Sequence, residues 1–418
     1  MNKFFFDTLG CKINQYETQA IREQVISTGG LVTEDILEAD YFIINTCVVT
    51  ETAEKASLHK IRKALRDNPK VKVVVTGCLA ELPVKHKELE GRTLVIKNDA
   101  KKDLALMLGL TKEKNELKVS GLFGHKRSFL KIEDGCENSC AYCIVPFLRG
   151  KIKSRPLPEI IEEAKRLTDG GYAEIVLTGI NLGAYGKDLE KKITLETVVN
   201  NILKVNNLQR LRLSSLEPEY INEKLIDIIA ESRGKICPHL HVPLQSGDAE
   251  VLKLMNRRYS TADFSGKIEM ARKKIKDLSI TTDIIVGFPG ETEKMFENSL
   301  EFMQQQGFLK VHVFSYSDRP GTKASLMKDK VTESDKERRY QKMLSASETE
   351  GKKFARTFLG KELEVLVEGI ERRKNKSIKG FSENYIKITI VDGTEKDIGK
   401  LVKVKLESVE KENYGKKV

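Results

Sequence analysis

The chain has 418 residues, of which 40% are hydrophobic and 32% are charged, and its formal net charge is +11 at pH 7. These proportions are those of a globular protein of about two or three domains, and they exclude a disordered or fibrous chain. No apolar run approaches the length of a membrane span, and the apolar stretch from Phe4 to Phe6 is too short for a signal peptide. We therefore expect a cytoplasmic protein without a membrane partner.

Seven cysteines are present in the chain. In a cytosolic protein they are more often metal ligands than disulfides, because the compartment keeps thiols reduced. The positive charge is concentrated near the C-terminus, where residues 352–418 hold 17 Lys or Arg against 11 Asp or Glu. A basic surface favours a polyanionic partner, although it also simply aids solubility.

The first segment repeats one strand-and-cysteine unit. Its β-prone apolar runs occur at residues 3–8, 40–45 and 71–76, and helical patterns at 14–28 and 51–65 separate them. Each run is followed by a cysteine: Cys11, Cys47 and Cys78. Strands alternating with helices predict a parallel sheet, and the ends of such strands meet at one edge. We therefore expect the three thiolates to hold one cluster with an open corner, the alternative being three buried structural thiols.

The second segment opens with three cysteines spaced C-x3-C-x2-C, which are Cys136, Cys140 and Cys143. Soft thiolates select zinc, copper(I) or iron–sulfur clusters, and a closed zinc site would need a fourth nearby ligand. A three-cysteine set leaves one iron of a 4Fe–4S cube open to an amine and a carboxylate. This loop resembles that of the radical SAM superfamily, in which the open iron binds S-adenosylmethionine (SAM). The alternatives are a zinc knuckle and three unrelated buried thiols.

Six strand candidates then alternate with helical patterns. The strands are expected at 129–133, 174–178, 210–215, 239–244, 280–287 and 310–316, with the clearest helices at 158–169, 220–232, 261–278 and 293–306. This repetition predicts a partial (β/α)6 barrel, whose chemistry lies at the carboxyl ends of the strands. The expected SAM contacts are Tyr142, Gly179, Asn181, Ser214, Glu217 and Gln245. The alternatives are a turn or cap for each strand-end residue and shielding of the cluster from water for Tyr142. His239 and His241 share one strand face and are expected in the barrel core, and Cys237 is expected to be structural.

The third segment follows a helical stretch at 332–358. Runs at 362–367, 385–390 and 400–406 alternate apolar and polar residues between glycines, which predicts a small antiparallel β-barrel. Basic loops with nearby aromatics on such a barrel favour RNA binding, here with Phe381 and Tyr385 as stacking rings. The expected RNA contacts are Arg149, Arg372, Arg373, Lys374 and Lys376. The alternatives are a solvated hairpin turn for the loop and plain surface solubility for Arg149.

Taken together, the chain resembles the methylthiotransferases, which are α/β proteins with an N-terminal three-cysteine domain, a radical SAM barrel and a C-terminal TRAM domain. The resemblance implies domains at 1–118, 122–352 and 354–418. It also implies two 4Fe–4S clusters, an auxiliary one on the first three cysteines and a radical SAM cluster on the second three. As the resemblance implies, one SAM methylates a sulfur of the auxiliary cluster, and a second yields the radical that removes hydrogen from the substrate. The implied partners are tRNA and a reduced flavodoxin or ferredoxin, not DNA.

The stretch Thr8-Leu9-Gly10-Cys11-Lys12-Ile13-Asn14 is similar to the branch that acts on N6-threonylcarbamoyladenosine beside the anticodon of tRNA. The other branches act on N6-isopentenyladenosine in tRNA or on ribosomal protein S12, and both remain alternatives. A further alternative is an iron–sulfur RNA-binding protein that senses redox state without turnover. Reductive cleavage of SAM by the purified protein separates this last hypothesis from the enzymes.

Overall fold

The computed structural model describes residues 1–83, 86–112, 117–191, 193–371 and 377–418. Its chain divides into two compact units, which comprise residues 1–123, 134–152 and 317–325, and residues 124–133, 153–316 and 326–418. The loop that carries the second cysteine set therefore belongs to the same unit as the N-terminal segment. Within the described ranges, no helix is long and apolar enough to cross a membrane. The division into three consecutive domains stays a prediction.

The first unit is built on a parallel sheet. Its strands are β1 (Lys3–Thr8), β2 (Leu31–Val32), β3 (Tyr41–Thr46), β4 (Lys72–Gly77) and β5 (Thr93–Val95). They lie in the order β2-β1-β3-β4-β5, and every neighbouring pair is parallel. The helices of this unit are α1 (Lys12–Ser27), α2 (Glu51–Asp67), α3 (Leu104–Met107) and α4 (Val145–Arg149). The three strands expected from the sequence are confirmed, while β2 and β5 were too short to stand out.

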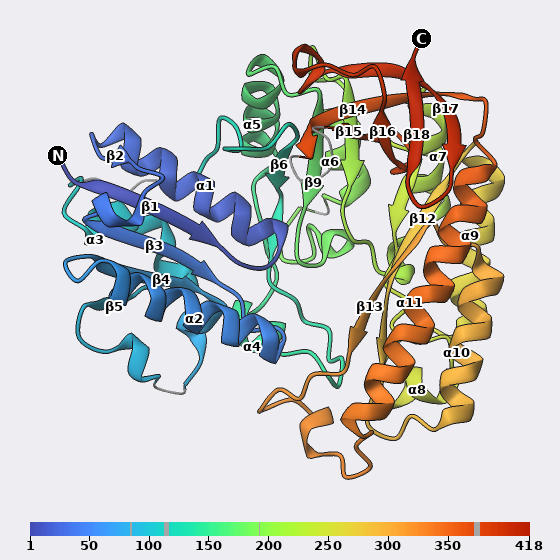
Figure 1. The fold of residues 1–418 in the computed structure, drawn as a ribbon, viewed down its shortest axis with the longest axis horizontal. Helices are drawn as coiled ribbons and strands as arrows, with labels where there is room; N and C mark the ends of the chain where they lie inside the picture. The colour runs from blue at the N-terminus through green and yellow to red at the C-terminus, as the bar shows by residue number, and fades with distance from the viewer. Residues whose placement is uncertain (84–85, 113–116, 192, 372–376) are drawn as a thin grey trace. The chain divides into compact units, whose positions relative to one another are not determined.

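Helices cover both faces of this sheet. Ile21 and Val25 of α1 pack with Phe4 and Ile43 in one core cluster. Residues of α2 pack with Phe42 and its neighbours on the other face, in a separate core cluster. In Figure 1, α1 and α2 accordingly lie on opposite sides of the sheet. Strands buried on both faces explain the continuous apolar runs in the sequence.

The second unit contains a parallel half barrel. Its strands are β6 (Ser128–Lys131), β9 (Glu174–Thr178), β10 (Arg210–Leu213), β11 (His239–His241), β12 (Ser279–Val286) and β13 (Lys310–Ser315). The sheets β10-β9-β6 and β11-β12-β13 are joined by parallel bridges between Leu211 and Ile236 and between Ser215 and His241. Short strands β7 (Glu133–Asp134) and β8 (Lys153–Ser154) flank the cysteine loop in the sequence. The partial barrel that the sequence predicts is confirmed.

Helices surround the half barrel. They are α5 (Leu157–Asp169), α6 (Leu195–Ile202), α7 (Glu223–Glu231), α8 (Ala249–Leu254), α9 (Thr261–Lys274), α10 (Glu293–Gln306) and α11 (Glu333–Arg356). Figure 1 shows α10 and α11 side by side, with α11 along β13. Strand β11 ends three residues earlier than expected, because Pro243 has no N–H to donate and Gln245 has a φ of 66°.

The C-terminal residues close a five-stranded barrel. Its strands are β14 (Glu362–Glu371), β15 (Ser377–Ser382), β16 (Lys387–Ile390), β17 (Leu401–Val409) and β18 (Asn413–Lys417). They follow the order β14-β15-β16-β18-β17, in which β16 and β18 are parallel and the other neighbouring strands are antiparallel. The expected strand at 385–390 begins only at Lys387, because Tyr385 turns the chain with a φ of 68°.

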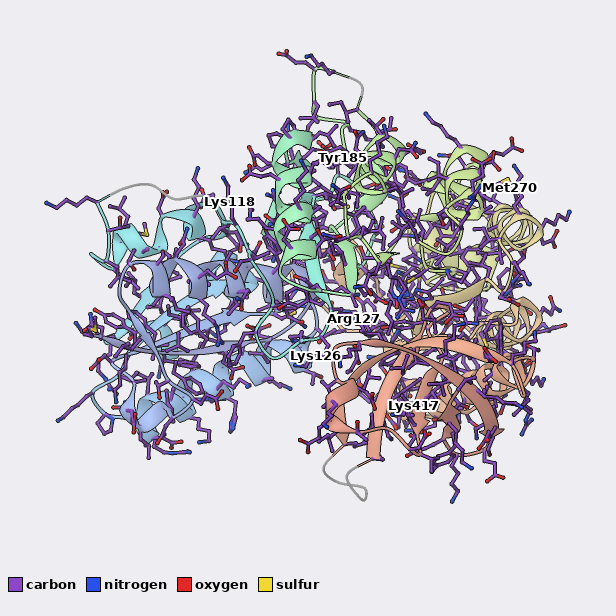
Figure 2. All side chains as sticks on the ribbon, turned by 90° about the horizontal axis from the view of Figure 1, so that it is seen from above. Lys118, Lys126, Arg127, Tyr185, Met270 and Lys417 are labelled. Carbon is purple, nitrogen blue, oxygen red and sulfur yellow. The ribbon has the colours of Figure 1, made fainter. Side chains whose placement is uncertain are left out.

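A buried carboxylate ties this barrel to the half barrel. Glu174 Oε1 lies 2.8 Å from Arg212 Nε and 3.0 Å from Arg127 Nη1, and Glu174 Oε2 lies 3.0 Å from Arg210 Nε. Arg212 also donates to the carbonyls of Ser382 and Glu383. Figure 2 shows Arg127 where the two barrels meet, beside a gathering of nitrogen atoms. Burial alone raises the pKa of Glu174, but the three guanidinium groups lower that pKa far below its usual range.

The ring of Tyr385 belongs to this same junction. It stacks on His239 with ring centroids 4.5 Å apart and on Phe381 at 4.9 Å, and the guanidinium of Arg212 lies 4.8 Å from its centre. The expectation that Phe381 and Tyr385 stack on RNA bases is therefore corrected, because both rings pack within the junction. Cys237 is buried there too, and burial raises its pKa to about 12, as expected of a structural thiol.

We predict that Glu174→Gln destabilises the protein by roughly 3–5 kcal/mol, because it leaves the buried arginines without their carboxylate. The measurement is the guanidinium chloride midpoint of purified protein. The control is Glu162→Gln on α5, whose exposed side chain pairs with Arg166 and whose loss should change little. Equal midpoints for the two variants would contradict a stabilising role for the buried carboxylate.

Candidate functional site

The three N-terminal cysteines follow neighbouring strands. Cys11 lies after β1 at the start of α1, Cys47 follows β3, and Cys78 opens the 3₁₀ turn η2 (Cys78–Glu81) after β4. Because β1, β3 and β4 are adjacent and parallel, their carboxyl ends lie at one edge of the sheet. The structure thus brings together three cysteines that are widely separated in sequence, at the edge where the sequence predicts them.

Two glycines permit this close approach. Gly10 has a φ of 97°, and a Cβ atom there would lie 2.8 Å from Cys47 Cβ. Gly77 has a φ of 88°, and a Cβ atom there would lie 2.4 Å from the Asn45 side-chain oxygen. A side chain at either position is excluded by conformation and by space. The positions directly before Cys11 and Cys78 therefore require glycine, because any side chain would clash there and would disfavour the backbone conformation.

The thiols of this set are free and differ in burial. Cys11 is exposed, while Cys47 and Cys78 are buried. Burial raises the pKa of Cys47, and it raises the pKa of Cys78 to about 11, against the opposing charge of Arg149. Iron binding would release these protons, since the thiolate is the ligand. Soft sulfur donors beside a buried guanidinium suit an anionic iron–sulfur cluster.

The second cysteine set lies on a loop closed by its own backbone. The amide of Cys136 donates to the carbonyl of Gly150 at 3.1 Å, and the amide of Cys143 donates to the carbonyl of Cys140 at 3.1 Å. The amide of Asn138 also points at Cys136 Sγ, 3.4 Å away. Such amide contacts to cysteine sulfur are usual around iron–sulfur clusters. None of the three thiols forms a disulfide and all are half-buried, so this donor set also fits a cluster.

Arg149 connects the two cysteine sets within the first unit. Its Nη1 lies 2.9 Å from Glu17 Oε1 on α1 and 2.9 Å from Asp134 Oδ2, and its side chain is 2% exposed. Its Nη2 donates to the side-chain oxygen of Asn14. The expectation that Arg149 binds RNA is corrected, because these buried partners already surround its guanidinium. The same partners show that the arginine belongs to the interior of the cysteine site.

The network extends from Arg149 to the sheet. Lys101 Nζ forms a buried ion pair with Glu17 and lies 3.3 Å from the side-chain oxygen of Asn45, just before Cys47. Asn14 donates to the carbonyls of Leu9 and Thr46 at 2.8 and 2.9 Å. One set of polar groups therefore holds the residues next to Cys11, Cys47 and Cys136. The sequence analysis missed Glu17 and Lys101, whose only signal was a charge at a core position of the helical pattern.

Five of the six expected SAM-binding residues belong to the second unit and follow strands β9, β10 and β11 at the carboxyl edge of the half barrel, whereas Tyr142 belongs to the first unit. The amide of Asn181 donates to Glu133 Oε1 at 2.6 Å, and a Cβ atom at Gly179 would lie 2.0 Å from that same oxygen. Glu133 is the member of this group that the sequence analysis missed. The buried side-chain oxygens of Asn181 and Ser214 have no hydrogen-bond partner among the described residues. Buried polar atoms without a partner favour a polar ligand here.

Glu217 and Gln245, the remaining members in the second unit, have distinct environments. Arg257 forms an ion pair with Glu217, and burial raises the pKa of this carboxyl group. Gln245 holds a left-handed backbone with a φ of 66° and is buried. Backbone strain of this kind is often found at binding sites. Tyr142 is half-buried between Cys140 and Cys143. The expected RNA contacts Arg372, Arg373, Lys374 and Lys376 lie outside the described residues.

The sequence similarity to known proteins extends over nearly the whole chain. The chain is 37% identical to the threonylcarbamoyladenosine tRNA methylthiotransferase MtaB of Bacillus subtilis, over 96% of this chain and 93% of that protein. It is 36% identical to MtaB of Thermotoga maritima, over 97% of this chain and 94% of that protein. A tRNA-2-methylthio-N(6)-dimethylallyladenosine synthase of Acetivibrio thermocellus is 32% identical, over 97% of this chain and 88% of that protein.

The fold comparisons agree with the half barrel. A cobalamin- and [4Fe-4S]-bound structure of the radical S-adenosylmethionine methyltransferase TsrM from Kitasatospora setae matches with a TM-score of 0.56 and 14% identity, over 78% of this chain and 77% of that one. The family description "Radical SAM superfamily" matches residues 130–303, and "Uncharacterized protein family UPF0004" matches residues 3–105. With relatives this similar over their full length, the chain belongs to the family of radical SAM methylthiotransferases that modify tRNA.

Proposed function

We propose that this protein converts N6-threonylcarbamoyladenosine beside the anticodon of tRNA to its 2-methylthio derivative. The observation that carries this proposal is its 36–37% identity, over nearly full length, to relatives named for that substrate. Relatives named for dimethylallyladenosine share 31–34%. The modification replaces the hydrogen on carbon 2 of the adenine ring with a methylthio group.

The cofactors of the family are 4Fe–4S clusters and SAM. On the donor sets described above, Cys11, Cys47 and Cys78 would hold an auxiliary cluster, and the C-x3-C-x2-C loop would hold the radical SAM cluster. When bound, these groups supply the radical that removes hydrogen from the substrate, and the sulfur and methyl group that replace it. Three cysteines on each cluster leave one iron of each open for this chemistry.

The side chains of this protein would bind SAM and the RNA and would hold the cysteine loop in place. Asn181 and Ser214 offer hydrogen-bond acceptors and a hydroxyl to the polar groups of SAM at the half-barrel edge. Arg149 holds the cysteine loop against α1 through Glu17. RNA phosphates would be neutralised by the basic segment Arg372, Arg373, Lys374 and Lys376, so binding should weaken with salt. A reduced flavodoxin or ferredoxin would supply electrons in the cytoplasm, with neither DNA nor membrane involved.

Deletion of the gene should remove the 2-methylthio derivative of threonylcarbamoyladenosine from cellular tRNA, and the threonylcarbamoyl precursor should accumulate. Nucleoside mass spectrometry measures both, and re-expression of the wild-type gene restores the product. Loss of 2-methylthio-isopentenyladenosine instead would assign the protein to the other tRNA branch. Unchanged nucleosides would refute a role in tRNA, and a modified S12 peptide would then identify the third acceptor.

The cysteine assignment predicts iron content. Anaerobically reconstituted wild-type protein should contain roughly eight irons per chain, and the triple Cys11, Cys47 and Cys78 to Ala variant roughly four, because each 4Fe–4S cluster has four. Cys237→Ala is the matched control, since this thiol is buried elsewhere and should leave the iron content unchanged. Four irons in both the wild type and the triple variant would show that the N-terminal cysteines are structural.

The buried network predicts a strong effect at Arg149. Arg149→Ala should destabilise the protein by roughly 3–5 kcal/mol, because Glu17 and Asp134 lose a buried cationic partner. It should also lower the iron retained on both cysteine sets, which a denaturant titration and iron analysis measure together. Arg66→Ala on α2, whose side chain is 71% exposed, is the control and should change neither. Identical behaviour of the two variants would exclude a positioning role for Arg149.

A further inference from the structure

Three neighbouring strands of the half barrel carry a polar cluster that the site described above does not include. It consists of His241 on β11, Asp283 on β12 and His312 on β13, and one side-chain N or O atom from each lies within 4.8 Å of the others. His241 Nε2 lies 3.2 Å from Asp283 Oδ2. The rings of His241 and His312 meet edge to face, with centroids 5.7 Å apart. We refer to these three residues as the His-Asp-His cluster.

Strand alternation places the cluster on the inner face of the half barrel. On β12, Ile280 and Ile284 are buried on the face that the surrounding helices cover. Asp283 points to the opposite face, where its pairing partner His312 also lies. The side chains of His241 and Asp283 are 18% and 25% exposed. The cluster can therefore reach a ligand in the interior of the half barrel, although its neighbours along the strands are buried.

The cluster is held in a defined orientation. Thr281 Oγ1 lies 2.9 Å from His241 Nδ1 and 2.9 Å from His239 Nε2. This contact on Nδ1 fixes the ring of His241 and directs its Nε2 toward Asp283. His239 is in turn stacked on Tyr385. A rigid support of this kind is typical of a binding site that orients its ligand.

The backbone links the cluster to two segments proposed to bind SAM. The amide of Gln245 donates to the carbonyl of Asp283 at 2.8 Å, and the amide of Leu216, next to Glu217, donates to the carbonyl of His241 at 2.9 Å. A ligand on the cluster would thus lie beside the carboxyl edge at which barrel enzymes perform their chemistry. This position suits a part of the substrate that must be held while a neighbouring atom reacts.

We propose that the His-Asp-His cluster binds the threonylcarbamoyl substituent on N6 of the substrate adenosine. This inference rests on the proposed function. The substituent offers a carboxylate and a urea carbonyl as acceptors, and a urea N–H and a hydroxyl as donors. Both ring nitrogens of His241 already contact Thr281 and Asp283, so the imidazole of His312 supplies the N–H donor to such oxygens, and the Asp283 carboxylate accepts from the N–H or hydroxyl. The cluster therefore complements the substituent with both kinds of hydrogen-bonding group.

The same chemistry selects against the dimethylallyl substituent named for other relatives. That substituent is a hydrocarbon, so it would displace water from the two histidines and the aspartate without replacing any hydrogen bond. A site built to hydrogen-bond its substrate rejects an analogue that lacks the bonding groups. The His-Asp-His cluster thus acts as a specificity determinant for the N6 substituent, and it takes no part in the bond-breaking steps.

The test pairs an enzyme variant with a substrate variant. Reconstituted wild type and His312→Phe are assayed on anticodon stem-loop RNA with threonylcarbamoyladenosine, and on the same RNA with an N6-alkylcarbamoyladenosine that lacks the carboxylate and hydroxyl. Loss of hydrogen bonds to charged groups should raise KM for the natural RNA by about 10- to 100-fold. The alkylcarbamoyl RNA should bind wild type equally poorly, and the substitution should then have little further effect.

His59→Phe on the exposed side of α2 is the matched control and should leave KM unchanged. Iron content and circular dichroism report whether His312→Phe folds. If this variant does not fold, the Asp283→Asn variant and the comparison of the two RNAs on wild type test the same inference. Equal KM for both RNAs on wild type would overturn the inference. Stoichiometric zinc or iron that is lost in Asp283→Asn would also overturn it and assign a metal site. No methylthiolation of the natural RNA by wild type would refute the proposed function instead.

Discussion

A parallel sheet places the carboxyl ends of its strands along one edge, and both units of this protein depend on that constraint. In the first unit it assembles Cys11, Cys47 and Cys78 from three consecutive strand-and-helix repeats. In the half barrel it gathers Asn181, Ser214 and the segment around Gln245. Each of these residues only has to come directly after its own strand in the sequence. The pairing of the strands then places the residues of each set close together.

Buried ion pairs connect segments that the strand pairing of the sheets does not bring together. Glu17 accepts from Arg149 and Lys101 inside the first unit, and Glu174 is shared by Arg127, Arg210 and Arg212 inside the second. Each network connects segments that are far apart in sequence. A carboxylate that serves several cations at once is costly to remove, because the remaining charges stay buried. These interactions specify which segments meet, whereas the apolar cores supply most of the stabilisation.

The two networks have different consequences. The network around Arg149 lies beside the cysteines and contacts segments next to both cysteine sets, so the two sets depend on common supporting residues. The network around Glu174 lies at the N-terminal ends of strands β9 and β10, and it joins the C-terminal barrel to the half barrel. Aromatic rings that looked available for nucleic acid, such as Tyr385, complete this junction.

Strand periodicity and cysteine spacing are local properties of the chain, so the fold class, most strands and both cysteine sets could be predicted from the sequence. The three cysteine-bearing strands and the C-x3-C-x2-C loop are examples. The environment of Arg149 depends on the tertiary fold, because its partner Glu17 lies 132 residues away. The tertiary fold also decided that His241, Asp283 and His312 form one cluster, since pairing between strands β11, β12 and β13 sets their register. Burial and partners depend on distant segments, and no local pattern encodes them.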